Sequence, residues 1–533
     1  MKLSSTAYKD GIRKVQQVRF GGLNHNLGAG DGELWDMENL TSDLYPLLSP
    51  RKPRYLAAKL EKPNGLYAKD GLYWVDGTGF YKDGVLKGTV TDGKKRFASL
   101  GTRVVILPDK KYYDSYDDTF GSMEASATAS CTIQDGTYAG ETAAANTIHS
   151  DSVEWASVFS AGDAVTISGA ATHPANNQTI IIREIDGHDL RFYENSFTID
   201  EGGDSETLTL SRSVPDMDYI CENENRLWGC KGDEIFASKL GDIFNWNVFD
   251  GLSTDSYAVD VGSGGDFTGC FSYLGYPCFF KEENVYKVYG DKPSNFQVMG
   301  SAFLGIEEGS AGSPAIAGET LFYLSRTGVM AYAGGFPESI HKAFGTERYR
   351  NAVGGTDGVK YYVSMEDTKG SYHLFVFDTG GNLWHREDAK QVIGFGWDKE
   401  LYFLDSDGNL WLSGNVREVP VGATPEDVVE SMAETGDFTN YSTSAAQYGS
   451  NEKGTAKLHV RMELEAGAEV TISIQFDSSG EWETVKKLTA AKKQSYYLPI
   501  IPRRSDHYRL RIEGKGDYRL YSLAREDYSG SEL

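Results

Sequence analysis

The sequence predicts an all-β protein whose main part is a β-propeller of six or seven blades, and three observations lead to this prediction. Helical patterns are scarce along the chain. Short apolar runs recur in pairs joined by turns of Gly, Asp or Asn, which supply the positive φ that tight hairpin turns need. Several of these pairs are separated by about 40 to 50 residues, the length of a four-stranded propeller blade.

Seven such pairs occur between residues 71 and 411. We expect β-hairpins at 72–81, 104–113, 226–236, 278–286, 321–332, 374–384 and 401–411. The third to the sixth start 52, 43 and 53 residues apart, whereas the seventh follows after only 27, so the period is irregular. A β-sandwich would show turns at closer and more even spacing without a longer period.

The segment between Tyr116 and Met217 has a different texture and interrupts the series of hairpins. Its first part, 121–150, is rich in Ala, Ser, Thr and Gly. Strand-like runs follow at 164–167, 179–182, 190–193 and 208–210. Because loops tolerate long insertions, we expect a small β-domain over 121–213, inserted into a connection between blades.

The C-terminal part begins with Thr424-Pro425-Glu426-Asp427, which predicts one short helix with Thr as N-cap and Pro in the first turn. Six strands are expected after it, at 457–464, 469–476, 482–488, 496–501, 508–512 and 518–523. The alternation of apolar and polar residues over 470–476 indicates a sheet with one buried face. The C-terminal domain is therefore predicted to be an antiparallel sheet or sandwich.

These observations divide the chain into five parts. The predicted parts are an N-terminal arm over 1–54, the propeller over 55–120 and 214–420, the insertion over 121–213, and the short helix with the C-terminal β-domain over 421–533.

Composition excludes several functional classes. With 40 % hydrophobic and 12 % aromatic residues, the chain can bury a core, which excludes wholesale disorder. A net charge of -25 excludes a general DNA-coating role, because an acidic surface gains nothing from counterion release. There is no run of 18 apolar residues and no apolar segment behind the first residues, so we expect neither a transmembrane helix nor a secretory signal.

The five cysteines are odd in number and lack any C-x-x-C spacing, which indicates free, mostly buried thiols in a protein that matures in a cytoplasm.

The run Asp405 to Asn409 resembles the start of a calcium loop. A calcium loop needs Gly at its sixth position and a bidentate Glu at its twelfth. Here the sixth residue is Leu410 and the twelfth is Val416, whose side chain cannot bind calcium, so a hairpin turn is favoured.

No catalytic constellation is evident in the sequence. His385 stands beside Arg386, Glu387 and Asp388, a string that fits acid–base machinery or, more commonly, a polar cluster at a blade edge. We predict that the protein is not an enzyme and has no catalytic, cofactor-binding or metal-binding residues.

Two terminal segments carry a family resemblance. The first contains Gly21-Gly22-Leu23-Asn24, the run from Gly32 to Leu40 with Trp35-Asp36-Met37-Glu38-Asn39, and the run Tyr45 to Arg51 with Pro46 and Pro50. The second contains Pro502-Arg503-Arg504-Ser505-Asp506-His507-Tyr508-Arg509-Leu510-Arg511-Ile512 and Tyr518-Arg519-Leu520-Tyr521-Ser522-Leu523.

These segments resemble those of structural propeller proteins of tailed bacteriophages, in particular the tail-hub, or packaged-DNA stabilisation, proteins of short-tailed phages. Those chains also begin with an Asn-Leu/Met segment leading to a strand with Pro and Arg, and close with an Arg-rich strand pair. The likeness covers most of the chain in layout and these two segments in residues. The insertion near 121–213 and the larger C-terminal sheet depart from the family's layout.

The resemblance implies a non-enzymatic virion component, assembled in the host cytoplasm and not bound to a membrane. Such proteins form a homo-oligomeric ring, commonly of six copies, below the portal and adaptor. The ring extends the DNA channel, helps to retain the packaged genome and carries other tail parts. An acidic channel wall would repel DNA phosphates and let the genome slide.

The C-terminal arginines are the candidate interface. Arg503, Arg504, Arg509, Arg511 and Arg519 lie in an otherwise acidic chain. They could pair with acidic loops of a neighbouring subunit or of the adaptor, or they could occupy the solvent face of a strand. Two other functions stay open: a receptor- or glycan-binding propeller at the tail tip, and a secreted carbohydrate-active propeller.

Overall fold

The computed structural model describes residues 12–26, 30–414, 416–438, 453–501, 505 and 507–529. Regular structure in these residues is almost entirely β and includes no α-helix. There are four short 3-10 helices, η1 (Trp155–Ser157), η2 (Pro174–Asn176), η3 (Pro293–Asn295) and η4 (His341–Phe344). None of the helices in this part of the chain is long and apolar enough to cross a membrane. The chain divides into two compact units, Met1–Asp70 with Gly312–Leu533, and Gly71–Ala311.

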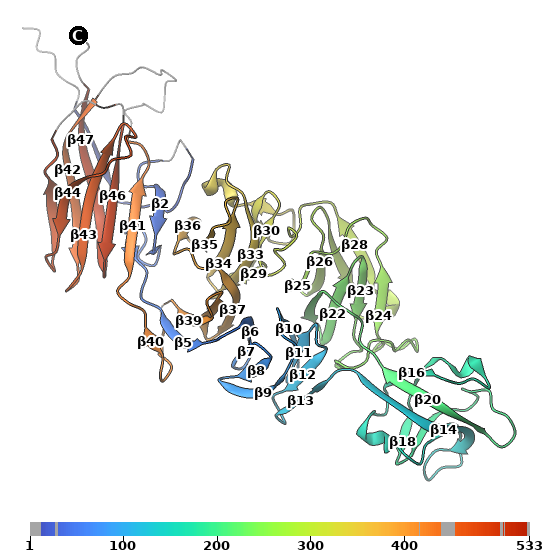
Figure 1. The fold of residues 1–533 in the computed structure, drawn as a ribbon. Helices are drawn as coiled ribbons and strands as arrows, with labels where there is room; N and C mark the ends of the chain where they lie inside the picture. Colours follow the sequence, from blue (N-terminus) through green and yellow to red (C-terminus); the bar gives the residue numbers. More distant parts are fainter. Residues whose placement is uncertain are drawn as a thin grey trace, which may run out of the picture. The chain divides into compact units, whose positions relative to one another are not determined.

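The second unit contains propeller blades from the first half of the chain (Figure 1). Its meanders are β7 (Leu72–Asp76), β8 (Gly79–Lys82) and β9 (Val85–Thr89); β10 (Arg96–Leu100), β11 (Arg103–Leu107), β12 (Lys111–Asp114) and β13 (Thr119–Ser122); β21 (Tyr219–Asn223), β22 (Arg226–Lys231), β23 (Glu234–Ala237) and β24 (Tyr257–Asp260); and β25 (Gly269–Tyr273), β26 (Tyr276–Phe280), β27 (Val285–Tyr289) and β28 (Gln297–Ser301). The first strands β10, β21 and β25 pack side by side, as the inner strands of successive propeller blades do.

The first unit contains the remaining blades. They are β29 (Ala315–Ala317), β30 (Thr320–Ser325), β31 (Gly328–Tyr332) and β32 (Glu338–Ser339); β33 (Tyr349–Thr356), β34 (Lys360–Asp367), β35 (Tyr372–Asp378) and β36 (Leu383–Arg386); and β37 (Val392–Asp398), β38 (Glu400–Asp405) and β39 (Asn409–Ser413). The N-terminal strand β5 (Tyr55–Lys59) pairs with β39 and completes the last blade. Residues early and late in the sequence therefore share one sheet.

Strand β6 (Pro63–Ala68) packs against β37 within this unit. Two glycines of β37 permit the close approach. A Cβ on Gly394 would lie 3.3 Å from the Cβ of Leu66, and one on Gly396 would lie 3.1 Å from the Cβ of Ala68. These distances are tighter than ordinary van der Waals contact, so glycine is the residue that fits here.

All seven predicted hairpins are confirmed by antiparallel pairing. The irregular spacing also has an explanation. Strands β30, β34 and β38 begin at Thr320, Lys360 and Glu400, which are 40 residues apart. The predicted pair at 374–384 is the third and fourth strand of its blade, whereas the other late pairs are the second and third. The period is therefore regular in this part of the chain.

The predicted insertion is an antiparallel sheet with a core of its own. Its seven strands are β14 (Ala125–Thr137), β15 (Ala144–His149), β16 (Ala164–Ser168), β17 (Thr179–Ile181), β18 (Glu184–Asp186), β19 (Asp189–Tyr193) and β20 (Asp204–Arg212), in the order β17-β16-β20-β14-β15-β19-β18. The four predicted strand runs correspond to β16, β17, β19 and β20. Trp155, Phe192 and Leu208 are among the residues of its core.

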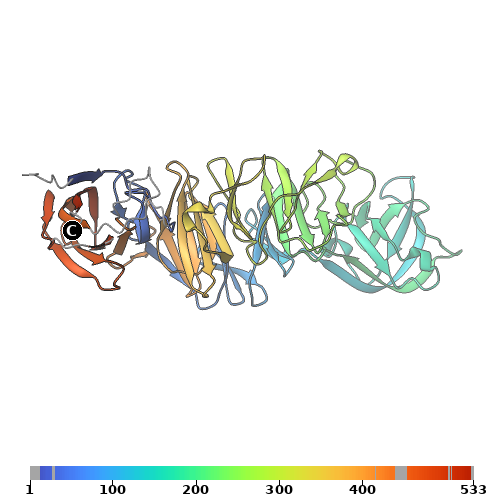
Figure 2. The same ribbon diagram turned by 90° about the horizontal axis from the view of Figure 1, so that it is seen from above.

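The C-terminal domain consists of two sheets. One has the order β1 (Ile12–Gln17), β47 (Tyr518–Ser529), β42 (Lys453–Leu464) and β45 (Lys493–Leu498). The other has the order β2 (Leu34–Glu38), β41 (Glu430–Thr435), β46 (Tyr508–Lys515), β43 (Glu469–Phe476) and β44 (Glu483–Leu488). Seen from above, the two sheets form facing layers (Figure 2). The predicted sandwich and its six strands are confirmed.

The N-terminal arm is part of this C-terminal domain, which the predicted boundaries did not anticipate. β1 pairs with β47, and β2 pairs with β41, which lies beside it in Figure 1. The short strands β3 (Leu40–Thr41) and β4 (Ser49–Pro50) follow, and Leu48 bridges to Leu520. Sheet edges offer unpaired backbone groups to any strand, so chain order gives no hint of this pairing.

The predicted short helix at Thr424 to Asp427 is wrong. Thr424 and Pro425 form β40, which pairs with β5. The Glu426 carboxylate accepts hydrogen bonds from Arg51 and from the backbone N–H of Arg54. These tertiary contacts outweigh the local N-terminal helix signal.

One hydrophobic core is shared by the C-terminal domain and the neighbouring blades. It joins Ile472 and Leu520 of the sandwich to Phe375 and Trp384 of the β33–β36 blade. Residues of the N-terminal segment, such as Met37, lie in the same core. β2 belongs to a sheet of the sandwich, and β2 and β3 pack beside β36, so the N-terminal segment connects sandwich and blade.

Candidate functional site

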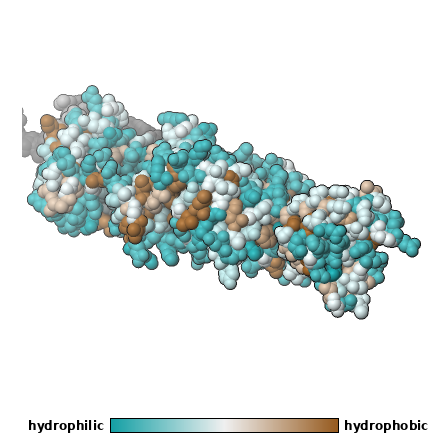
Figure 3. All heavy atoms as spheres, turned by 60° about the horizontal axis from the view of Figure 1, so that its bottom comes forward, coloured by the Kyte–Doolittle hydropathy of each residue, from teal (hydrophilic) through white to brown (hydrophobic). Residues whose placement is uncertain are grey.

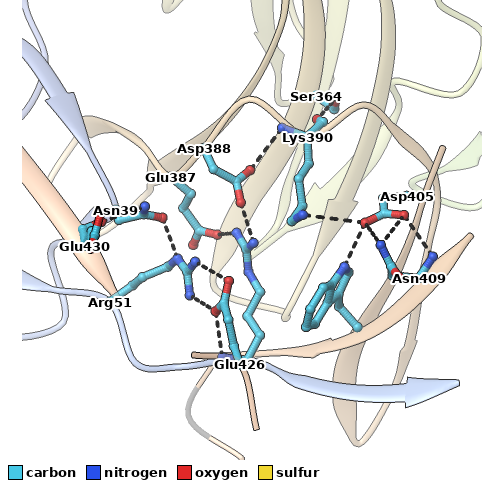
Figure 4. A network of polar contacts seen from close by, with 12 residues as sticks. Asn39, Arg51, Ser364, Glu387, Asp388, Lys390, Asp405, Asn409, Glu426 and Glu430 are labelled. Carbon is cyan, nitrogen blue, oxygen red and sulfur yellow. Dashed lines mark hydrogen bonds and ion pairs between the residues drawn. The ribbon is translucent and has the colours of Figure 1, made fainter. Parts of the chain in front are cut away.

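A buried network of charges lies where the N-terminal segment meets the last two blades (Figure 4). We call its five residues, Arg51, Arg54, Glu387, Asp388 and Glu426, the arginine clamp. The Arg51 guanidinium donates to both oxygens of Glu426, at 2.7 and 3.0 Å. Its Nε donates to the Asn39 side-chain oxygen at 2.8 Å. Bidentate pairs of this kind fix geometry as well as contribute energy.

Arg54 is the centre of the clamp and its side chain is only 1 % exposed. It donates to the carboxylates of Glu387 and Asp388, and its guanidinium lies 5.0 Å from the centroid of the Phe403 ring. Burial lowers the pKa of Arg54, but Asp388, Glu387 and Glu426 outweigh it and the net shift is upward. Burial raises the pKa of Asp388, but Arg54 outweighs it and the net shift is downward. The clamp is therefore charged on both sides at neutral pH.

A pocket of about 210 Å³ lies beside the clamp and is lined by Arg54, Lys360, His385 and Glu387 among others. His385 is 3 % exposed and its Nδ1 has no hydrogen-bond partner. Burial lowers the pKa of His385 to about 4, so the ring is neutral near pH 7. The string from His385 to Asp388 thus consists of a buried neutral ring and two carboxylates held by Arg54. This is the arrangement of a polar structural cluster.

The Asp405 turn is the hairpin turn that the sequence favours over a calcium loop. Asp405 accepts from the backbone N–H of Asn409 and from Nε1 of Trp411, both at 2.8 Å. The ammonium of Lys390 lies 3.6 Å from the same carboxylate. The turn at Asp378 has a similar sequence, because Leu383-Trp384 follow it as Leu410-Trp411 follow the Asp405 turn. There, however, Trp384 donates to the backbone oxygen of Ile340 at 2.8 Å. Similar sequences here close their turns through different partners.

A second pocket, of about 350 Å³, combines aromatic rings and carboxylates. Trp35, Tyr349 and Phe375 line it together with Glu347 and Asp367. Burial raises the pKa of Glu347, but hydrogen bonds from His25 and Tyr349 outweigh it and lower the pKa overall. The pKa of Asp367 is also lowered. Burial raises it, but the hydrogen bonds that Asp367 accepts from the Ser371 backbone and from His373 outweigh this effect. Both carboxylates are ionised at neutral pH and cannot donate a proton.

The C-terminal arginines that the structure describes form ion pairs within their own domain. Arg509 and Arg511 bind the same carboxylate, Glu434, at 3.2 and 2.8 Å. Arg511 also lies over the Trp482 ring at 4.1 Å. Arg519 lies 3.7 Å from Glu463. Arg503 and Arg504 lie outside the described residues.

The thiols are free in the structure. Cys131, Cys230 and Cys278 are buried, and Cys221 and Cys270 are half-buried. Burial raises the pKa of Cys278 to about 12, so this side chain is a protonated thiol at neutral pH. The predicted free, mostly buried thiols agree with this arrangement.

On the face drawn in Figure 3, hydrophilic residues predominate and hydrophobic ones lie in separate patches. Trp397 and Val359 are 51 % and 60 % exposed, and both line the pocket beside the arginine clamp. Scattered apolar residues are normal on a protein surface.

Sequence reasoning assigned no role to the arginine clamp. The only local signal is Pro50-Arg51-Lys52-Pro53-Arg54, in which Pro53 favours an extended conformation for Lys52, between the two arginines. Their partners Glu387 and Glu426 lie 333 and 375 residues further along the chain. Nothing in the sequence indicates which of the 77 acidic residues they would be.

Fold and site together define a β-propeller protein with two added β-domains and a buried structural charge network. No protein-family model matches the chain. No curated protein matches its sequence.

Several solved propeller-like structures have similarity to the chain. BamB from Moraxella catarrhalis aligns with a TM-score of 0.32 and 12 % identity, over 68 % of this chain and 97 % of its own. U3-55K aligns with a TM-score of 0.32 and 7 % identity, over 68 % and 98 %. An exo-beta-1,3-galactanase from Phanerochaete chrysosporium aligns with a TM-score of 0.20 and 8 % identity, over 57 % and 94 %.

Proposed function

We propose that this protein is a non-enzymatic structural component of a tailed-bacteriophage virion, a tail hub or neck ring that joins the head–tail connector to other tail parts. One observation carries the proposal. The two terminal segments that resemble the phage family come together in one domain, where β2 and β46 flank β41 in a single sheet. The resemblance therefore falls on residues that jointly build one structural element.

The chemistry of the clamp supports a structural role. Arg51 and Arg54 pair with three carboxylates. Arg51 connects the N-terminal segment to Glu426, and Arg54 connects it to the adjacent residues Glu387 and Asp388. We call the pocket lined by Trp35, Tyr349 and Phe375 the aromatic pocket. Its two carboxylates, Glu347 and Asp367, have lowered pKa values. A glycoside hydrolase needs one carboxyl group whose pKa is raised so that it can protonate the leaving group. These two residues do not meet that requirement.

The assembly we propose is a closed ring, most simply of six copies, built on the portal and adaptor. Closed cyclic symmetry is what a protein needs to surround a channel. The net charge of -25 suits a channel wall that repels the phosphates of passing DNA. Arg503, Arg504, Arg509, Arg511 and Arg519 remain the proposed contacts to acidic neighbours, although Arg509 and Arg511 also hold Glu434 within the sheet.

The test is the location and copy number of the protein in purified virions. We expect cryo-electron microscopy of the tail to place this fold at the neck or hub, and quantitative mass spectrometry to give a number of copies that closes a ring. A single copy per virion would refute the ring. Particles from which the protein is absent would refute the virion role itself.

A glycan-binding propeller at the tail tip is the second candidate, and the aromatic pocket is the observation that favours it. Trp35 and Tyr349 beside hydrogen-bonding carboxylates are a combination that binds sugars. Glycan-array binding by the purified protein that disappears in Trp35→Ala would support this function. Equal binding by the variant would remove the pocket as its basis.

A further inference from the structure

Three side chains with metal-binding atoms meet at one edge of the inserted domain. His173 stands directly before η2, Asp200 lies in the loop that leads into β20, and Asp204 is the first residue of β20. His173 Nε2 is 3.3 Å from Asp200 Oδ1 and 3.5 Å from Asp204 Oδ2. The three ligand atoms all lie within 4.8 Å of one another.

Two of these atoms have no hydrogen-bond partner although they are buried. Asp204 is 6 % exposed, and neither its Oδ2 nor His173 Nε2 makes a hydrogen bond. A buried carboxylate oxygen that accepts no hydrogen bond is unfavourable, so its neighbourhood calls for an explanation. A cation held by these atoms would provide one.

The spacing fits coordination through a shared ion. Zinc binds imidazole nitrogen and carboxylate oxygen at about 2.0–2.2 Å with tetrahedral geometry, which places neighbouring ligand atoms about 3.4 Å apart. The two distances from His173 Nε2 are close to this value. Calcium and magnesium prefer oxygen ligands, so the imidazole favours a transition metal.

The two loops that carry the ligands are held in place before any ion binds. The Asn176 side chain donates to the backbone oxygen of Thr198 at 2.8 Å and accepts from the Thr198 N–H at 2.9 Å. Asn176 is buried, and Gly203 N–H donates to the Asp200 backbone oxygen at 3.0 Å. Glu206 accepts from the Ala171 N–H at 3.0 Å. The site is therefore preorganised by neighbours that are not ligands.

A second trio in the same domain has the same composition and different geometry. His149 bonds through Nδ1 to Asp189 at 2.7 Å and through Nε2 to Asp151 at 3.1 Å. Both ring nitrogens are thus satisfied by hydrogen bonds. By contrast, His173 Nε2 lies near two carboxylates and makes a hydrogen bond with neither. The His149 trio therefore provides a matched control.

We propose that His173, Asp200 and Asp204 bind one divalent transition-metal cation, with Zn²⁺ as the ion that best fits their chemistry. Two carboxylates balance the charge of the ion. Asp200 is 69 % exposed at its side chain, so solvent water reaches the remaining coordination position. The bound ion would tie the loop before η2 to the start of β20 and so stabilise the insertion.

The test uses the full chain, freed of metal with EDTA and then titrated with Zn²⁺ by calorimetry. We expect one site that loses about 100-fold or more in affinity in His173→Ala and Asp204→Asn, because a lost ligand weakens binding at least as much as a lost outer-shell group. His149→Ala should bind like the wild type. Co²⁺ should give the visible absorption of a tetrahedral site in the wild type and not in His173→Ala.

Because Asp204 is buried, its variant could also fail to fold, so Asp200→Asn serves as the second variant. Asp200 is exposed and its substitution should leave circular dichroism unchanged while weakening Zn²⁺ binding. Equal Zn²⁺ affinity in His173→Ala, Asp200→Asn and the wild type would overturn the proposal. Binding of Ca²⁺ with no binding of Zn²⁺ would overturn the transition-metal assignment.

Discussion

The two β-domains added to the propeller are attached in opposite ways. The insertion has its own core around Trp155 and Phe192 and forms hydrogen bonds with the loop between β23 and β24 of the neighbouring blade. Asn245 of that blade accepts from the Ala164 N–H at 2.9 Å and donates to Asp163 at 3.0 Å. The C-terminal domain instead shares one core with the β33–β36 blade and is joined to it by the N-terminal segment.

The difference indicates which domain is separable. A polar contact between two complete cores can be broken with a modest loss, because each side keeps its own buried apolar surface. A shared core cannot be divided without exposing large side chains such as Phe375 and Trp384 on one side. The insertion can therefore be gained or lost independently, and the C-terminal domain cannot.

Removal of the C-terminal domain should have the largest effect. A variant ending at Val429 would leave the blade residues of the shared core uncovered and the N-terminal strands without partners. We expect it to be insoluble or to lack a cooperative thermal transition, as followed by circular dichroism. A soluble variant that melts cooperatively would show that the blades fold without the C-terminal half of the shared core.

Arg54→Ala should come next, because it leaves Glu387 and Asp388 buried without their cation. Breaking a buried ion pair on one side costs about 3–5 kcal/mol, and we expect a loss of this size in the free energy of unfolding by urea. Lys14→Ala is the control, since that side chain is 72 % exposed, and it should be indistinguishable from the wild type. An Arg54→Ala loss as small as the control's would contradict the structural role of the clamp.

His385 should make the stability of the same region depend on pH. Its pKa is about 4 in the folded protein against 6.5 for the ordinary value, so the unfolded chain binds the proton more readily. Stability should therefore fall as the pH is lowered from about 6.5 to 4, by about 3 kcal/mol in total. Urea unfolding at several pH values should show this slope, and His385→Phe should flatten it. An unchanged slope in the variant would assign the pH dependence to other groups.

Deletion of the insertion should be tolerated. Ala125 and Arg212 are register partners in the β14–β20 pair, so a short Gly-Ser linker can replace 124–212. We expect a folded protein with a free energy of unfolding lower by about 1–3 kcal/mol, because Asn245 loses buried partners. Aggregation of this variant would show that the insertion, like the C-terminal domain, cannot be removed without unfolding the rest of the protein.

Asn245→Ala in the full chain should have the smallest effect, about 1 kcal/mol, and should act on the contact between insertion and blade. Limited proteolysis should cut the insertion's connections faster in this variant. Asn247→Ala is the neighbouring control, since its side chain makes one long hydrogen bond of 3.5 Å. Equal cleavage rates in both variants would argue that Asn245 does not hold the insertion.

The sequence by itself determined the local elements of this protein. All seven hairpins and the six C-terminal strands could be predicted, because turn residues and apolar alternation act within a few residues of each other. The predicted helix at Thr424 to Asp427 failed for the complementary reason, since its cap signal is local and the contacts of Glu426 with Arg51 and Arg54 are not.

Only the tertiary structure decided how distant segments combine. The pairing of β1 with β47 and of β5 with β39, and the choice of Glu387 as partner of Arg54, join residues more than 300 positions apart. Sheet edges and carboxylates are chemically alike throughout an acidic β-protein, so their partners are selected by the global packing. The same holds for His173, whose sequence neighbours give no sign that Asp200 and Asp204 stand beside its ring.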